Sequence, residues 1–331
     1  MSILFFLISL FLSGCSPQKE VFKREEMVLG TFGEITCFGE KDSCKKGIDK
    51  AFREIKNLEE ILSFFKAESD ISFLNNAQGK PVGVKKETLE VLKKAKEISQ
   101  KTQGAFEVTV APLLAIWGFY QKEKESFSPP SGELIKETLA LVGQDKIILA
   151  EDTGSVILKN PSMKIDLGGL AKGYIVDRAV AVLKKEEIKN ALVNLGGDIF
   201  CLSEGRTAKV WKIGIQDPQA KEKLIATLKV RNKAIATSGQ YENFREFKGK
   251  KLGHIIDPRT GYPVENDVLS VTVVASDCLT ADALATAIFV LGKEQGSALL
   301  KTFSAEAVII SKSPKGKRLW ISGGLKNKVS Y

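Results

Sequence analysis

Residues 164–174 read KIDLGGLAKGY, and the interpretation of the whole chain starts from this stretch. The apolar residues up to Leu167 predict a strand over 163–167, and the two glycines that follow predict a tight turn. Apolar residues then recur at helical spacing, which predicts a helix over about 171–184. Free amides at a helix start, together with the positive end of the helix dipole, bind phosphate groups. Asp166 and Lys172 are therefore candidate ligand-binding residues, although an ordinary strand–turn–helix would give the same pattern.

Outward from this stretch, helices and strands mix without a strict alternation. Helices are predicted over about 48–65, 86–102, 171–184 and 280–291. Strands are predicted over 28–37, 155–158, 163–167, 191–195, 212–216, 224–230, 268–275, 307–310 and 319–321. This order favours an α+β fold with mixed or antiparallel sheets and packed helices over a doubly wound α/β fold.

The composition sets limits on function. The chain has 331 residues, of which 44% are hydrophobic and 27% charged, as in soluble globular proteins. The net charge is +9, but the lysines are scattered among glutamates, so we expect solvated helix faces and no nucleic-acid partner. The single histidine argues against a multi-histidine metal site. After the first fifteen positions no apolar run is long enough to span a bilayer.

The N-terminus predicts a targeting signal. Residues 1–12 read MSILFFLISLFL, which is apolar but too short for a spanning helix. The following Ser13-Gly14-Cys15 resembles the lipobox of a bacterial lipoprotein, with cleavage before Cys15 and acylation of its thiol. No Lys or Arg precedes the apolar run, so a plain secretory signal remains the alternative. We expect a signal peptide over 1–14, a polar linker over 15–26 and one domain over 27–331.

Four further cysteines are Cys37, Cys44, Cys201 and Cys278. Outside the cytoplasm a disulfide is permitted, and Cys37 with Cys44 is the nearest pair. The sequence leaves the state of this pair open. Cys201 lies in an apolar run and is most simply a small buried side chain.

A second candidate site is TADALAT at residues 280–286. Asp282 and Thr286 are four residues apart and would share one face of a helix. Carboxylate and hydroxyl oxygens suit Mg²⁺, which takes few protein ligands and leaves positions for substrate phosphate. A capped helix without a metal is the simpler alternative.

A third candidate is GHIIDPRTGYP at residues 253–263, which holds the only histidine before a Pro/Gly turn. Its ordinary pKa of about 6.5 suits proton transfer near neutral pH. A lone histidine is more often structural, so His254 becomes a candidate base only if the neighbouring chemistry requires one.

Taken together, these segments resemble the ApbE family, the FAD:protein FMN transferases. The resemblance rests on DLGGLAKGY at 166–174, ATSGQYENF at 236–244, HIIDPRTGYP at 254–263 and ADALATAIFVLG at 281–292, in the family's order. Residues 29–31, 62–75 and 104–119 fit the family's upstream segments. Leu29 replaces the usual Met, Phe65 a frequent Tyr, and Glu107 an Asp.

The resemblance implies an ApbE-like, T-fold-like architecture and a set of site residues. Mg²⁺ would be held by Asp282, Thr286 and the backbone carbonyl of Gly169. FAD would be held by Asp166, Lys172 and the amides of the glycine turn. The implied residues near the flavin or lining its site are Leu29, Phe65, Ala105, Phe106, Glu107, Ser238, Gly239, Tyr241 and Ile256.

The implied reaction transfers FMN from FAD to a Ser or Thr hydroxyl of a partner protein and releases AMP. His254 would be the base, and Asp257 would orient it. An FAD pyrophosphatase, with water as acceptor, and a non-catalytic FAD-binding lipoprotein are the alternatives. The acceptor would be a redox protein, and the enzyme would be anchored to a bacterial membrane on its periplasmic or other extracytoplasmic face.

Overall fold

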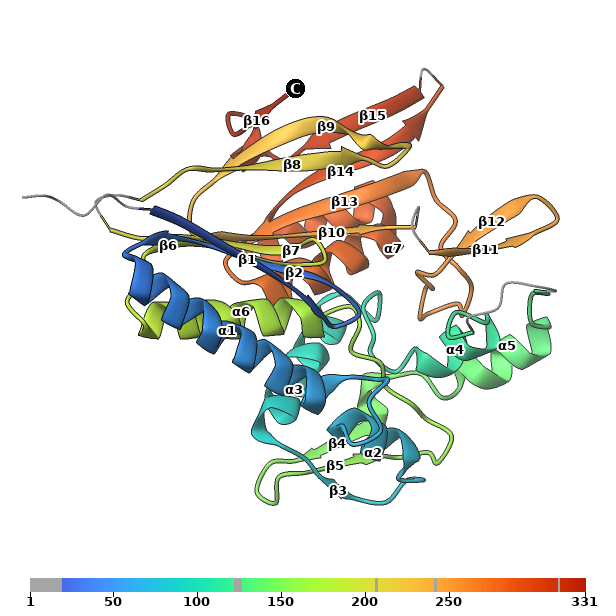
Figure 1. Cartoon of the computed structure of the whole chain (residues 1–331). Helices are drawn as coiled ribbons and strands as arrows, with labels where there is room; N and C mark the ends of the chain where they lie inside the picture. The colour runs from blue at the N-terminus through green and yellow to red at the C-terminus, as the bar shows by residue number, and fades with distance from the viewer. Residues whose placement is uncertain (1–19, 122–126, 206–207, 241–242, 315) are drawn as a thin grey trace, which may run out of the picture.

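An eight-stranded sheet forms the centre of the molecule (Figure 1). The computed structural model describes residues 20–121, 127–205, 208–240, 243–314 and 316–331. In order across the sheet, the strands are β1 (Glu20–Val28), β2 (Thr31–Gly39), β6 (Asn190–Leu195), β7 (Asp198–Ser203), β10 (Lys233–Gly239), β13 (Val268–Ala275), β14 (Glu306–Ser313) and β15 (Gly316–Ile321). Every neighbouring pair is antiparallel.

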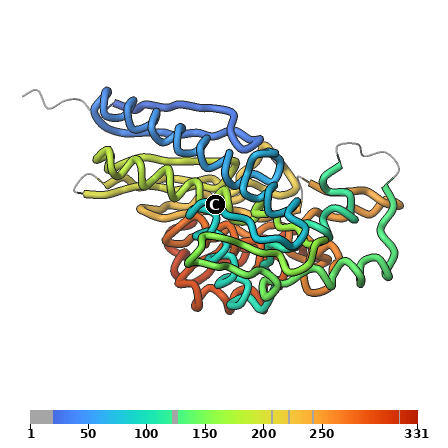
Figure 2. Tube along the Cα trace, turned by 90° about the horizontal axis from the view of Figure 1, so that it is seen from below, coloured from blue at the N-terminus to red at the C-terminus, as the bar shows by residue number. Residues whose placement is uncertain are grey.

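Three long helices cover one face of this sheet: α1 (Lys41–Leu62), α6 (Ala171–Lys185) and α7 (Cys278–Thr302). Figure 2 shows α1 and α6 running side by side on this face. The helix α1 forms because apolar residues recur at helical spacing and become its buried face, while Glu40 accepts hydrogen bonds from the amides of Asp42 and Ser43 and caps its start. A disulfide between Cys37 and Cys44 ties the end of β2 to the start of α1.

The other face of the sheet is covered by a three-stranded sheet in the order β16 (Val329–Ser330), β9 (Ala220–Val230) and β8 (Trp211–Asp217). Ile215, Leu228 and Val230 of this small sheet pack against apolar residues of the central strands and form a second core. Both faces of the central sheet are therefore buried over β10, β13 and β14, which explains why these strands are rich in Val, Ile and Ala.

The remaining elements lie below and to the right in Figure 1. One group comprises α2 (Asp70–Asn76), α3 (Lys86–Lys101) and the sheet of β3 (Val82–Gly83), β5 (Ser155–Leu158) and β4 (Ile147–Ala150). The other comprises α4 (Ala111–Ile116), α5 (Gly132–Leu139) and the hairpin of β11 (Phe244–Phe247) and β12 (Lys250–Gly253). Leu113, Trp117 and Leu252 belong to a third apolar cluster that joins this second group.

The structure confirms the predicted α+β class, with antiparallel sheets and packed helices. The predicted helices correspond to α1, α3, α6 and the first part of α7, which ends where Gly292 takes a φ of 75°. The prediction of a linker over 15–26 is wrong from residue 20 onward, because β1 begins at Glu20. The strand predicted over 28–37 is instead divided by a turn at Leu29 and Gly30, both of which have positive φ.

The strand predicted over 163–167 is also wrong, because this segment pairs with no strand. Instead, the side-chain amide of Asn75 pairs with the backbone of Ile165: its oxygen accepts from the Ile165 amide at 2.7 Å and its nitrogen donates to the Ile165 carbonyl at 2.9 Å. An asparagine side chain thus takes the place of a neighbouring strand.

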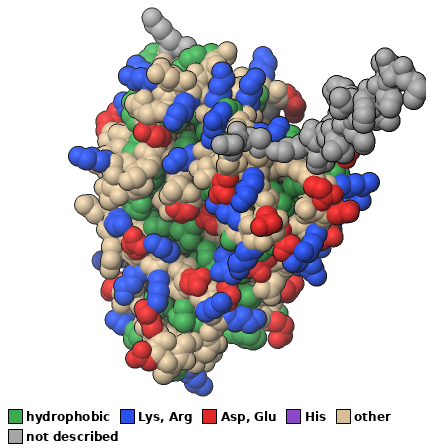
Figure 3. All heavy atoms as spheres, turned by 90° about the vertical axis from the view of Figure 1, so that its left-hand side faces the viewer, with side chains coloured by type: hydrophobic (Ala, Val, Ile, Leu, Met, Phe, Trp, Pro, Cys, Tyr) green, Lys and Arg blue, Asp and Glu red, His purple; other side chains and the backbone are tan. Residues whose placement is uncertain are grey.

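Charged side chains of both signs mix on the surface. On the face shown in Figure 3, Lys and Arg side chains interleave with Asp and Glu. Among the described residues, no helix is both long and apolar enough to cross a bilayer.

Candidate active site

A cavity of about 410 Å³ lies where the segments of the three candidate sites meet. Its walls come from the loop at 105–107, the turn at 166–172, the end of β10, the segment at 254–258 and one face of α7. Of the residues predicted to form the site, those lining the cavity are Ala105, Phe106, Glu107, Asp166, Gly169, Lys172, Ser238, Gly239, His254, Ile256, Asp282 and Thr286. The fold therefore brings together segments that are far apart in the sequence.

The turn at 168–170, which we call the glycine corner, is held by Asp166. One Asp166 oxygen accepts from the Gly168 amide at 2.8 Å, and the other accepts from the Tyr120 hydroxyl at 2.6 Å. Desolvation and the neighbouring Asp166 raise the pKa of Tyr120 above its usual range, so the phenol stays protonated and can donate this bond. A Cβ atom at Gly169 would lie 3.2 Å from the Phe106 ring and 3.8 Å from Thr286 Oγ1. The corner thus approaches α7 closely because it carries no side chain there.

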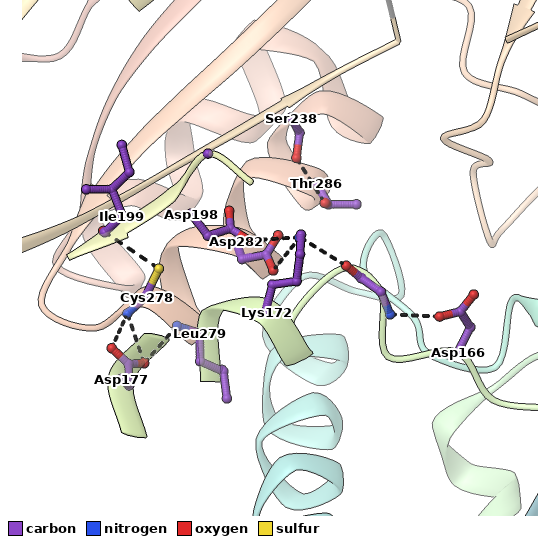
Figure 4. Close-up of polar contacts among 12 residues, drawn as sticks. Asp166, Lys172, Asp177, Asp198, Ile199, Ser238, Cys278, Leu279, Asp282 and Thr286 are labelled. Atoms are coloured by element: carbon purple, nitrogen blue, oxygen red, sulfur yellow. Dashed lines mark hydrogen bonds and ion pairs between the residues drawn. The ribbon is translucent and has the colours of Figure 1, made fainter. Parts of the chain in front are cut away.

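Two carboxylates share one lysine at the centre of the cavity (Figure 4). Lys172 Nζ lies 2.7 Å from Asp198 Oδ2 and 3.6 Å from Asp282 Oδ2. Desolvation opposes the charge of Lys172, but the two carboxylates outweigh it and raise its pKa above the ordinary range. The lysine is therefore a fixed cation.

Asp282 is nearly fully buried, with 6% of its surface exposed. Desolvation, and after it the charge of Asp198, raise its pKa, while Lys172 and the backbone amide of Gly173 oppose this shift. Its Oδ2 atom has no hydrogen-bond partner among the residues that the structure describes. A buried carboxylate oxygen without a donor is costly, and a cation would remove that cost.

Thr286 follows Asp282 by one helical turn and faces the same cavity. Its Oγ1 lies 3.1 Å from Ser238 Oγ. The site thus presents a carboxylate and hydroxyls beside the glycine corner, a set of hard oxygen donors that fits Mg²⁺. Within the described ranges no group of three or more His, Cys, Asp or Glu side chains could hold a metal, so a cation here would take other oxygens as well.

His254 lies at the cavity wall directly after β12. Its Nδ1 is 3.1 Å from the carbonyl oxygen of Asn243. Since a carbonyl can only accept, Nδ1 carries the proton in this contact and Nε2 is the basic nitrogen. In this tautomer Nε2 is the nitrogen that can accept a proton.

Asp257 binds the arginine of the turn that follows it. Its carboxylate accepts from the Arg259 backbone amide at 2.9 Å and from the Arg259 guanidinium at 2.9 and 2.7 Å. Asp257 is not among the residues that line the cavity, and its role in orienting His254 stays a prediction.

Some predicted flavin contacts lie outside the cavity lining. Phe65 is 80% exposed, with its ring centroid 6.3 Å from that of Tyr120. Leu29 lies at the turn of the β1–β2 hairpin. The amide of Gly196, which lines the cavity, donates to the Phe32 carbonyl of this hairpin at 3.1 Å. Tyr241 and Cys15 lie outside the described residues.

The sequence analysis missed Asp198, which is 4% exposed and nearest to Lys172. The sequence does contain a pattern that could have indicated this residue: in Leu195-Gly196-Gly197-Asp198, a second Gly-Gly pair is followed by an aspartate. Further lining residues that were missed are Val110, Leu114, Gly196, Thr237, Asn243 and Pro258.

Comparisons with known proteins identify a family. The family model described as "ApbE family" matches residues 29–309. An FAD:protein FMN transferase of Klebsiella pneumoniae is 37% identical over 269 residues, 80% of this chain and 82% of that protein. An FAD:protein FMN transferase of Vibrio cholerae is 31% identical over 328 residues, 97% of this chain and 96% of that protein.

Solved structures give the same result. The ApbE protein of Thermotoga maritima superposes with a TM-score of 0.84 at 32% identity, covering 92% of this chain and 98% of that one. The flavin transferase ApbE of Vibrio cholerae superposes with a TM-score of 0.80 at 29% identity, covering 94% and 100%. From the matched motifs, the cavity that they form and these likenesses, we conclude that the chain belongs to the ApbE family.

Proposed function

We propose that this protein transfers FMN from FAD to a Ser or Thr hydroxyl of a partner protein and releases AMP. The names of relatives that share 31–37% identity over most of the chain support the reaction class. The observation that carries the proposal is the Oδ2 atom of Asp282, which is buried beside Thr286 and opposite the glycine corner and accepts no hydrogen bond from the described residues, with Lys172 Nζ 3.6 Å away. This arrangement suits a cation and a diphosphate together.

Asp282, Thr286 and the backbone of Gly169 are the residues that would hold Mg²⁺. Bound there, the ion would neutralise charge on the FAD diphosphate and so stabilise the transition state. The amides of the glycine corner and the Lys172 ammonium would bind the phosphate oxygens. Asp198 keeps Lys172 oriented toward the cavity centre.

The acceptor hydroxyl is a weak nucleophile and needs a base. Nε2 of His254 would accept its proton as the hydroxyl oxygen forms a bond to the FMN phosphorus. The bond from that phosphorus to the oxygen of AMP breaks, and AMP leaves with the electron pair. The protein contributes mainly position and charge, as is general for phosphoryl transfer.

We further propose that Cys15 is acylated and anchors the protein to a bacterial membrane on its extracytoplasmic face, where it meets a redox protein as acceptor. The apolar residues 1–12 and the lipobox-like sequence support this. The Cys37–Cys44 disulfide supports an oxidising compartment.

The test is incubation of the purified protein with FAD, Mg²⁺ and a candidate acceptor, followed by mass spectrometry of the acceptor. We expect the acceptor to gain the mass of FMN less water, and AMP to appear in equal amount. Release of free FMN and AMP without acceptor modification would mean hydrolysis, and FAD binding without turnover would mean a binding protein. The variant His254→Ala should bind FAD but transfer FMN slowly.

A further inference from the structure

Hydrogen bonds join α6 to the start of α7. On α6, the Asp177 carboxylate accepts hydrogen bonds from the Cys278 amide, at 2.8 and 3.0 Å from its two oxygens, and from the Leu279 amide at 2.9 Å (Figure 4). A carboxylate of α6 thus binds amides at the start of α7, where a helix leaves amides without a partner in its own backbone.

The backbones of the two helices also touch. A Cβ atom at Gly173 would lie 2.4 Å from the carbonyl oxygen of Cys278, so only glycine fits there. The backbone of Cys278 is therefore fixed on both sides, with its carbonyl against Gly173 and its amide on Asp177. Because of this, α7 cannot slide or rotate along α6 without losing hydrogen bonds or creating an overlap.

The contacts determine how the two halves of the cation site face each other. Lys172 and the glycine corner precede Gly173 on one side, and Asp282 and Thr286 follow Cys278 on the other. Asp177 itself does not line the cavity. It lies behind the site, where it can act only through the helix that it holds.

We propose that Asp177 is a positioning residue for the cation site: it holds the first turn of α7 against α6 and so sets the spacing between the Asp282–Thr286 face and the glycine corner. The proposal rests on the proposed function for the identity of the cation, Mg²⁺. Residues that hold metal ligands in place often change metal affinity by about 10- to 100-fold when they are replaced.

Asp277 provides a matched control. Its carboxylate caps the same helix by accepting from the Thr280 amide at 2.9 Å, but it belongs to α7 itself and makes no bridge to α6. The variant Asp277→Asn removes the charge at the helix start and keeps an oxygen that can cap it, so it should not change the position of α7 on α6.

The experiment measures Mg²⁺ binding by calorimetry in the presence of AMP, together with the melting temperature, for wild type, Asp177→Asn, Asp177→Ala and Asp277→Asn. We expect the dissociation constant for Mg²⁺ to rise about 10-fold or more in Asp177→Ala and less in Asp177→Asn, which keeps one acceptor oxygen. The dissociation constant should stay within about 2-fold of wild type in Asp277→Asn, even if the melting temperature of Asp277→Asn is as low as that of the Asp177 variants. If Asp177→Ala does not fold, the proposal is tested by comparing the Mg²⁺ dissociation constants of Asp177→Asn and Asp277→Asn.

Transfer kinetics give a second measurement. In Asp177→Asn, the Mg²⁺ concentration for half-maximal rate should rise, while kcat at saturating Mg²⁺ should return to near the wild-type value, because the groups that touch the substrate are intact. Equal Mg²⁺ constants in Asp177→Asn and Asp277→Asn would overturn the proposal. If wild type binds Mg²⁺ but transfers no FMN, the proposed function fails while the binding data still test the role of Asp177.

Discussion

Lys172 of α6 forms its closest ion pair with Asp198 of β7, at 2.7 Å, and lies 3.6 Å from Asp282, the acid on the cation-binding face of α7. This preference has a chemical consequence. The lysine is held by a carboxylate that has no other assigned task, and the Oδ2 atom of Asp282 stays available to a cation. Asp198 thus separates the positive charge that binds substrate from the negative charge that binds metal.

The variant Asp198→Asn should therefore weaken metal binding. Without the Asp198 charge, Lys172 would turn toward Asp282 and compete with the cation, and the site would lose one negative charge. We expect the Mg²⁺ concentration for half-maximal transfer to rise about 10-fold or more. Asp217→Asn is the control, since Asp217 is another largely buried acid paired with a lysine, Lys317, and does not line the cavity. An unchanged Mg²⁺ requirement in Asp198→Asn would show that Lys172 does not depend on this acid.

The metal-binding role of α7 can be tested at each of its two side-chain oxygen donors, Asp282 and Thr286. Asp282→Ala should abolish Mg²⁺-dependent turnover, because it removes the carboxylate that faces the cavity beside Thr286 and whose Oδ2 atom accepts no hydrogen bond from the described residues. Thr286→Val keeps the shape of the side chain and removes its hydroxyl, so it should raise the Mg²⁺ requirement about 10-fold. Thr302→Val, at the exposed end of the same helix, should have no effect. Normal Mg²⁺-dependent rates in Asp282→Ala would refute the metal site.

Much of this site could be predicted from the sequence, because many of its residues lie in short sequence motifs. Asp282 and Thr286 share a face by helical spacing alone, and Gly169 follows from a Gly-Gly turn before a helix. Asp198 could not be placed in the same way, because its position beside Lys172 depends on how β7 packs against α6. The contact between the Asp257 carboxylate and the Arg259 guanidinium was not predicted either, because the prediction for Asp257 considered only its proximity to His254 in the sequence.

Elements with a strong hydrophobic periodicity were predicted correctly. Two segments were predicted wrongly because contacts with residues elsewhere in the chain decide their structure. In β1 the polar residues resemble a linker, yet Arg24 pairs with Asp49, and Glu26 pairs with Lys56 at 2.6 Å, both on α1. The strand therefore carries charges on the face toward the helix and lacks the usual alternation. The segment 163–167 had the apolar pattern of a strand, but Asn75 satisfies its backbone. Neither partner is visible in local sequence.

The roles of His254 and Asp257 can be separated by pH. If His254 is the base, the rate of transfer in wild type should fall at low pH as the imidazole becomes protonated, and His254→Ala should lose this dependence. Asp257→Asn should leave the pH profile unchanged, because its carboxylate binds Arg259. A shift of the profile in Asp257→Asn would instead support the hypothesis that this acid acts on the histidine.

The raised pKa of the Glu107 carboxyl predicts that the stability of the folded protein depends on pH. Desolvation raises the pKa of this carboxyl above its ordinary 4.5, although the amides of Thr109 and Gln144 and the Ser99 hydroxyl oppose the shift. The folded protein thus binds this proton more tightly than the unfolded chain does. Its contribution to stability is complete below about pH 4.5 and is lost as the pH rises through the higher folded-state value. The melting temperature of wild type relative to Glu107→Gln should accordingly decrease from pH 4.5 upward. A constant difference across this range would contradict the shift.

The disulfide should contribute measurable stability. The Cys37–Cys44 bridge closes a short loop, with a sequence separation of 7, between the end of β2 and the first turn of α1. For a loop of this size the chain-entropy model gives about 2 kcal/mol, and folding under reducing conditions should lower the free energy of unfolding by about that amount. Urea unfolding with and without reductant measures the change, and Cys44→Ser should show no response to reductant.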